Sequence, residues 1–157
     1  MDLTIRRAAP VDARLLADLR LNSQLERNGG DAAALTGFHR ESEAAFAEFL
    51  AGGSMLAWLA FDGEFVVGTA SLLVYRTLPR VDARGVTGRR FDGRIRNVRV
   101  EPDYRRRGIA ARLVRAATAE AERLGVDRLT LGTSTMGRPL YSHLGWVDKG
   151  DEMVFRF

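Results

Sequence analysis

A basic turn with a single glycine lies in the second half of the chain, where residues 105–108 read Arg-Arg-Arg-Gly. It follows a short apolar alternation that stops at Pro102, and a helical pattern begins after it at Ile109. The first turn of a helix offers unpaired backbone N–H groups, and a glycine such as Gly108 lets a ligand approach the main chain. Arginines add charge-assisted hydrogen bonds to phosphate oxygens. The turn therefore predicts a diphosphate site, with an ordinary strand-to-helix turn and solvated arginines as the alternative.

Several other kinds of site are disfavoured by what the sequence lacks. There is no Gly-x-x-x-x-Gly-Lys-Ser/Thr motif, and Lys149 is the only lysine, which argues strongly against a P-loop. There is no Gly-x-Gly-x-x-Gly after a strand, which argues against a dinucleotide fold. Cysteine is absent, so neither a disulfide nor a thiolate nucleophile is available. Two distant histidines, His39 and His143, do not suggest a zinc site, and no Gly-x-Ser-x-Gly of a serine hydrolase occurs.

Three blocks of sequence resemble one known family. Residues 105–110, Arg-Arg-Arg-Gly-Ile-Ala, resemble the acyl-coenzyme A signature Gln/Arg-x-x-Gly-x-Gly/Ala of the GNAT superfamily of N-acetyltransferases. Residues 97–105 resemble its central strand and the exit from it. Residues 138–146, Arg-Pro-Leu-Tyr-x-x-Leu-Gly-Trp, are similar to its late helix and turn, where Tyr-x-x-Leu-Gly-Phe is usual. The resemblance is closest over residues 95–157 and weakest over residues 76–93.

The resemblance implies an acetyl-coenzyme A site. In the family the backbone of the fourth strand pairs with the pantetheine arm, and the basic turn holds the pyrophosphate. By resemblance, the first role falls to Val98, Arg99 and Val100, and the second to Arg105, Arg106, Arg107, Gly108, Ile109 and Ala110. Ser134 lies near the same site, although many members have an asparagine there. No metal is implied.

Tyr141 is the candidate general acid, because a phenol can protonate the thiolate that leaves when an amine attacks a thioester. The family often has a tyrosine at this place, and the alternative is a tyrosine at the edge of the core that packs beneath the pantetheine. No general base is evident, since Arg94, Arg96 and Arg99 occupy the positions where some members have a glutamate. Glu26, at the end of the first helix, is the candidate for binding a cationic acceptor; a solvated carboxylate is the alternative.

The elements that must position these residues can be read in order. We predict strands over residues 3–7, 55–61, 65–75, 95–100 and 128–133, and closing strands at 146–147 and 153–157. We predict helices from Pro10 to about residue 27, over about residues 41–50, from Ile109 to residue 124, and over 136–144. Gly68 inside its strand indicates a bulge or a close backbone approach. Residues 76–93, rich in Arg, Gly and Asp, are expected to form a long connection, either functional or merely solvated.

This order of elements predicts one α/β domain over residues 1–157. The resemblance implies a mixed, mostly antiparallel sheet, splayed after its fourth strand and covered by helices on both faces. Hydrophobic residues make up 46% of the 157, charged residues 28%, and no stretch is apolar enough to span a membrane or to act as a signal peptide. We therefore expect a cytoplasmic protein. Dimerisation is common in the family, and no residue here tests it.

The function implied is an N-acetyltransferase that moves an acetyl group from acetyl-coenzyme A directly to a primary amine of a small molecule or peptide. An acyl-coenzyme A sensor domain without turnover is the alternative, favoured by the missing glutamate. The net charge of +4 also allows a nucleic-acid binder. That possibility ranks last, because the arginines are scattered and not interleaved with aromatic residues.

Overall fold

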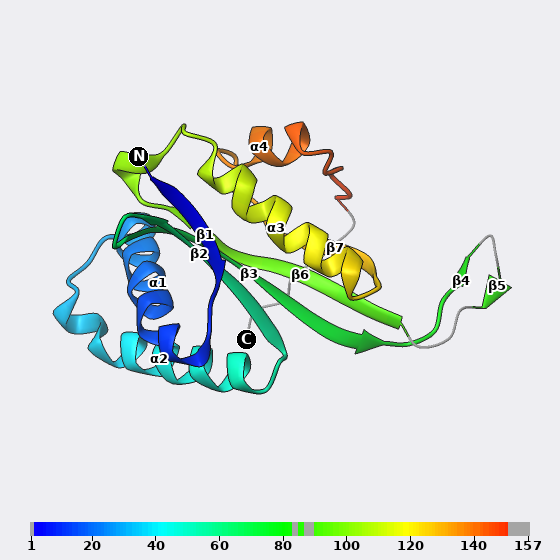
Figure 1. Cartoon of the computed structure of the whole chain (residues 1–157), viewed down its shortest axis with the longest axis horizontal. Coiled ribbons are helices and arrows are strands. Elements are labelled where there is room, and N and C mark those ends of the chain that lie inside the picture. Colours follow the sequence, from blue (N-terminus) through cyan, green and yellow to red (C-terminus); the bar gives the residue numbers. More distant parts are fainter. Residues whose placement is uncertain (1, 83–84, 87–89, 151–157) are drawn as a thin grey trace.

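The computed structural model describes residues 2–82, 85–86 and 90–150 (Figure 1). Its strands are β1 (Leu3–Arg7), β2 (Met55–Asp62), β3 (Phe65–Thr77), β4 (Val81–Asp82), β5 (Gly85–Val86), β6 (Arg90–Val100) and β7 (Val126–Leu131). Its helices are α1 (Ala13–Asn28), α2 (Thr36–Ala51), α3 (Ile109–Arg123) and α4 (Arg138–His143). Short 3-10 turns cover Pro10–Asp12, Ala33–Leu35 and Pro102–Tyr104.

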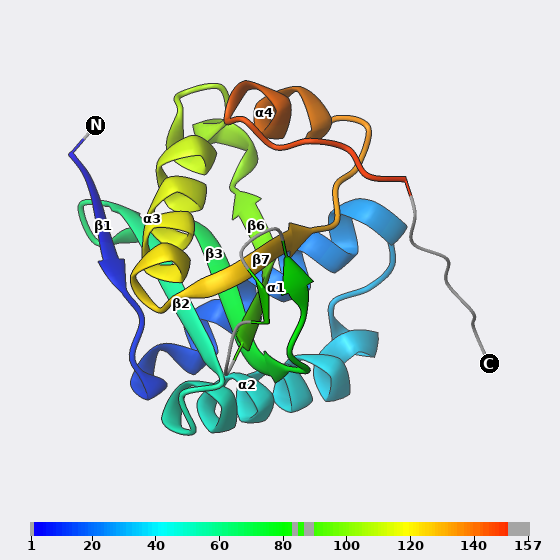
Figure 2. The same cartoon turned by 90° about the vertical axis from the view of Figure 1, so that its right-hand side faces the viewer.

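A five-stranded mixed sheet with the order β1-β2-β3-β6-β7 forms the centre of the fold. All neighbours in it are antiparallel except β6 and β7, which run parallel. Figures 1 and 2 show α1 and α2 on one face of the sheet and α3 and α4 on the other, while the β4–β5 ribbon projects away from the body. The α/β class, the mixed sheet and its two helical layers are as the sequence predicted.

Each face of the sheet has its own apolar core. The helix α3 buries an apolar stripe against Leu72 and other residues of the central strands, and this stripe consists of Ile109, Leu113, Ala117 and Ala121. On the opposite face, α1 and α2 bury Leu16, Leu19 and Phe46 against Ala57 and Leu59 of β2. The strands β2 and β3 are nearly continuous apolar runs because both faces are covered.

A bulge and a close backbone approach lie side by side at the centre of the sheet. Between β3 and β6 the pairing passes from Thr69↔Arg99 to Ser71↔Arg96, so that β6 carries an extra residue, and Asn97 takes a left-handed φ of 51°. Gly68 lies beside this bulge: a Cβ there would come within 2.8 Å of the Arg99 carbonyl oxygen. The predicted close backbone approach at Gly68 is therefore confirmed, and glycine is required because only hydrogen fits.

Several sequence-based boundaries were wrong. Most of residues 76–93 do not form a loop, because β3 continues to Thr77, β6 begins at Arg90 and a β4–β5 ribbon lies between them. Helix α2 begins at Thr36 rather than near residue 41. Residues 146–147 are not a strand, and the strand expected at 153–157 lies outside the described residues. Within the described residues, no helix combines the length and the apolar character that a membrane crossing requires.

We predict that Gly68→Ala destabilises the domain by about 1–3 kcal/mol, because the added methyl group would press on the Arg99 carbonyl and force the two strands apart. Urea unfolding followed by circular dichroism measures the change. Gly37→Ala is the matched control: it lies in α2, meets nothing within 4 Å and should be neutral or stabilising by up to about 1 kcal/mol. Equal stability of the two variants would contradict the close approach.

Candidate active site

The strands β6 and β7 part halfway along β6. Their parallel pairing runs from Phe91↔Val126 to Ile95↔Leu131, where β7 ends. Residues 96–100 continue as β6 with β3 on one side and no β7 on the other, and the two arrowheads point in different directions in Figure 2. On that side no strand of the part that the structure describes pairs with their backbone N–H and C=O groups, and those other than the Val100 carbonyl, which accepts from Arg105, can pair with an extended ligand as an added strand would. Val98, Arg99 and Val100 lie on this length of β6.

The basic turn leads from this open edge to the start of α3. Arg106 has a left-handed φ of 64° and Gly108 one of 76°, and Gly108 is the residue that caps the helix. A Cβ at Gly108 would meet nothing within 4 Å, so the space before the first turn of α3 is open. An exposed glycine at a helix start beside two parted strands suits a diphosphate attached to an extended arm, because the first N–H groups of a helix have no partner within it.

The arginines of the turn differ in what their side chains contact. The Nε of Arg105 donates to the Val100 carbonyl at 3.1 Å, and a second nitrogen lies 2.7 Å from the Glu26 carboxylate. The guanidinium of Arg107 donates to the Asp103 carbonyl at 3.0 Å and stacks on Tyr104 at 5.5 Å. Arg106 has no such partner among the described residues. Arg105 therefore ties the turn to β6 and α1, while Arg106 leaves its charge available to a ligand.

Glu26 lies between two arginines at the end of α1. Its carboxylate accepts hydrogen bonds from Arg105 and from Arg99, each at 2.7 Å, and these bonds hold the pKa of Glu26 below its usual value. The side chain of Arg99 is only 9% exposed and also pairs with Glu101 at 3.0 Å. Binding of a cationic acceptor by Glu26 remains a prediction, and such an acceptor would have to compete with Arg99 and Arg105.

Tyr141 lies in α4, on the opposite side of the sheet from Glu26. The side chain is 8% exposed, and its ring meets that of Trp146 edge-on at 6.3 Å between centroids. Burial raises the pKa of the Tyr141 phenol above its usual value, so the proton stays on the oxygen at neutral pH. A protonated phenol is what a general acid requires.

Ser134 lies just before α4, and its oxygen atoms accept hydrogen bonds from nearby backbone groups. Its Oγ accepts a hydrogen bond from the Gly137 N–H at 3.2 Å, and its carbonyl accepts from the same group and from Arg138 N–H. In the structure it thus holds the entry to α4; its contact with a cofactor remains a prediction.

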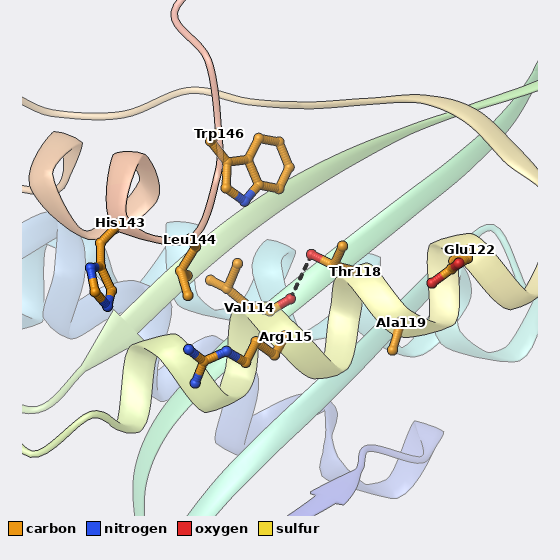
Figure 3. A pocket seen from close by; sticks show the side chains of 8 residues that line it. All are labelled: Val114, Arg115, Thr118, Ala119, Glu122, His143, Leu144 and Trp146. Carbon is orange, nitrogen blue, oxygen red and sulfur yellow. Dashed lines mark hydrogen bonds between the residues drawn. The ribbon is translucent and has the colours of Figure 1, made fainter.

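A shallow groove between α3 and α4 is distinct from the path along β6. Figure 3 shows Val114, Thr118 and Glu122 of α3 on one side, with His143, Leu144 and Trp146 on the other. None of the predicted cofactor-binding residues lines it. Among residues 2–82, 85–86 and 90–150, no group of three His, Cys, Asp or Glu side chains could hold a metal ion.

Comparison with known proteins agrees with this geometry. The model of the acetyltransferase (GNAT) family matches residues 25–146, so the chain belongs to that family and is an acetyltransferase. None of the curated proteins compared with the sequence matches it.

Solved structures of the same fold cover nearly the whole chain. A predicted acetyltransferase from Clostridium acetobutylicum with acetyl-CoA is 24% identical, with a TM-score of 0.82 over 98% of this chain and 96% of that one. A GCN5-related N-acetyltransferase from Ralstonia eutropha is 27% identical, with a TM-score of 0.81 over 99% and 98%. Glucosamine-6-phosphate N-acetyltransferase from Arabidopsis thaliana is 18% identical, with a TM-score of 0.74 over 100% and 99%. The two at 24% and 18% identity establish the fold alone.

The structure also brings together residues that sequence reasoning did not select. Arg20 of α1 donates to the Asn97 side chain at 3.0 Å, at the bulge in β6. Glu101, directly after β6, accepts from Arg99 and from Asn22. A polar residue within an otherwise apolar helix face was the available signal for Arg20. No sequence pattern indicated which strand it would meet.

We predict that Glu26→Gln lowers the free energy of unfolding at pH 7 by about 1 kcal/mol, because Glu26 is 38% exposed and solvent screens its ion pairs. The pKa of Glu26 is depressed in the folded state, so its contribution is present above its ordinary value of 4.5 and is lost as pH falls through the lower, folded value. The gap between the wild type and the variant should therefore close below about pH 4 in urea unfolding.

Glu41→Gln is the control for this prediction, because Glu41 makes no ion pair or hydrogen bond among the described residues and should leave the pH dependence unchanged. A gap that persists at low pH would show that Glu26 acts through its shape and not through its charge.

Proposed function

We propose that this protein is an N-acetyltransferase that moves the acetyl group of acetyl-CoA directly to a primary amine. The observation that supports the proposal most strongly is the open edge of β6 at residues 96–100, leading to the unobstructed helix start at Gly108. This arrangement offers backbone groups to an extended arm and N–H groups to a diphosphate at its end. The thioester would supply an activated acetyl group in the gap between β6 and β7.

The residues around that gap fit direct transfer. The amine nitrogen bonds to the acetyl carbon as the carbon–sulfur bond breaks, and Tyr141 donates its proton to the departing sulfur. The described part of β6 has arginines at the positions where a basic carboxylate could stand. We propose that the amine reacts in its neutral form, with water accepting the proton that it loses. No cysteine exists to carry an acyl-enzyme.

A second candidate is a sensor that binds an acyl-CoA without turnover, and the lack of a glutamate within β6 (Arg90–Val100) favours it. Release of free thiol over a panel of amines separates the two candidates. Binding of acetyl-CoA without thiol release for any amine would favour the sensor.

We predict that calorimetry detects binding of acetyl-CoA to the wild type and that Gly108→Val weakens it by at least about 10-fold, because the side chain would fill the space before the helix start. Gly125→Val is the matched control. It lies just beyond the other end of α3, with a similar φ of 70° and nothing within 4 Å, so it carries the same backbone strain. Equal loss of affinity in both variants, or no binding by the wild type at millimolar acetyl-CoA, would contradict the proposed site.

We predict that Tyr141→Phe lowers kcat for thiol release by about 10²-fold or more while the affinity for acetyl-CoA changes little. Because the pKa of Tyr141 is raised above 10.0, any decline of kcat that reflects its ionisation lies above pH 10 in the wild type and disappears in the variant. Tyr75→Phe, a change at a half-exposed tyrosine of β3, should leave kcat unchanged. Full activity of Tyr141→Phe would remove this residue from the mechanism.

A further inference from the structure

The face of β6 that α1 covers is unusually cationic at the point where the strands part. Arg96 is the first residue of β6 beyond the last pair with β7, and it is exposed. Arg20 approaches from α1, and the two guanidinium groups repel each other. Arg94 lies on the same face of β6, with its guanidinium near Gly132 at the end of β7. These side chains stand at the mouth of the gap, on the side opposite Tyr141.

Arg20 is held in place by two neutral groups. It donates to the Asn97 Oδ1 at 3.0 Å and stacks on the Phe38 ring of α2 at 5.3 Å. Its position is thus fixed while its charge is not neutralised. Burial, and repulsion by Arg96 and Arg27, lower the pKa of Arg20 below its usual value. The site therefore carries an electrostatic cost that a bound anion would relieve.

The carboxylates near this face are already engaged elsewhere. Glu26 pairs with Arg99 and Arg105, and Glu101 pairs with Arg99. Asp18 lies 2.6 Å from His39, and Asp92 lies 2.6 Å from Arg80. Among the described residues, no carboxylate pairs with Arg20 or Arg96.

Two buried hydroxyls lie on the same face. Ser71 of β3 is directly opposite Arg96, and Thr69 is opposite Arg99, so these side chains share a face with the arginines. Ser71 is 0% exposed and Thr69 is 2% exposed, and neither hydroxyl oxygen has a hydrogen-bond partner among the described residues. Buried hydroxyls are nearly always satisfied, and an ordered water or a ligand oxygen would satisfy these.

From this arrangement we infer that the acceptor is a primary amine bearing an anionic group, a carboxylate or a phosphate, which Arg20 and Arg96 bind while the amine points into the gap. Guanidinium groups bind both anions through paired hydrogen bonds. A polyamine or a lysine-rich peptide would instead bring positive charge to a positive site. The inference rests on the proposed function, since it names the acceptor of the same reaction.

Pairs of amines that differ only in the anionic group test this inference. L-amino acids are compared with their carboxamides, and amino-sugar phosphates with the unphosphorylated sugars, while putrescine serves as a cationic amine. Thiol release gives kcat/KM for each, and calorimetry of the same compounds with the acetyl-CoA-bound protein requires no turnover. For either the amino acids or the amino-sugar phosphates, we expect the anionic compounds to have a kcat/KM about 10- to 100-fold above that of their neutral partners. This is the gain from a charge-assisted hydrogen bond. The class of compound that shows this gain tells whether the arginines bind a carboxylate or a phosphate.

Two variants connect that preference to the arginines. Arg20→Gln and Arg96→Gln should each raise KM for the preferred anionic amine by about 10-fold or more, and change that of its neutral partner by less than about 3-fold. Arg96 is exposed, so its substitution does not endanger the fold. Arg14→Gln, an exposed change on the same helix, is the control and should alter neither value.

Equal or better use of neutral amines or putrescine, or binding of no anionic amine, would overturn the inference. Affinity for acetyl-CoA, measured in the same samples, distinguishes the failures: intact affinity with the wrong amine preference leaves the proposed function standing, whereas absent affinity removes that function first.

Discussion

The parting of β6 from β7 is the constraint on which the rest of the structure depends. A parallel pair gains one set of ladder hydrogen bonds for each residue it continues, so two neighbouring strands separate only where something prevents further pairing. Here β7 ends at Leu131, and the bulge at Asn97 turns the following residues of β6. The backbone groups left open on residues 96–100 need partners, and we propose that the extended arm of acetyl-CoA provides them.

The two faces of the sheet at this point have different chemistry. Towards α3 and α4 the surroundings are apolar, and the buried Tyr141 phenol keeps its proton there. Towards α1 the surroundings are polar and charged, with Glu26, Arg99 and Arg105 joining α1, β6 and the basic turn. The Glu26 carboxylate therefore connects α1, which we propose lines the acceptor side, to the basic turn proposed to hold the diphosphate. A displacement of α1 or of the basic turn would therefore alter the hydrogen bonds of the other through Glu26.

Much of the fold could be predicted from sequence because its signals are local. The Asp62-Gly63 turn between two apolar runs defined the β2–β3 hairpin, and the apolar stripe from Ile109 defined α3. The errors fell where local signals are weak. Residues 76–93 are polar and rich in glycine, yet the ends of β3 and β6 extend into them because each strand is paired by the other. Residues 146–147 have a strand-like composition, yet no strand among the described residues pairs with them.

The residues of the candidate site could also be predicted only where their signals are local in the sequence. The sequence by itself determined the kinds of residue at the basic turn, the glycine before α3 and the tyrosine on the late helix, because each is encoded within a few consecutive positions. Only the tertiary structure decided that Glu26 would be held by two arginines, and that Arg20 and Arg96 would repel each other while no carboxylate of the described residues pairs with either. Such pairings join residues more than 70 positions apart in the sequence, and their energies depend on distance and burial, which no linear pattern contains.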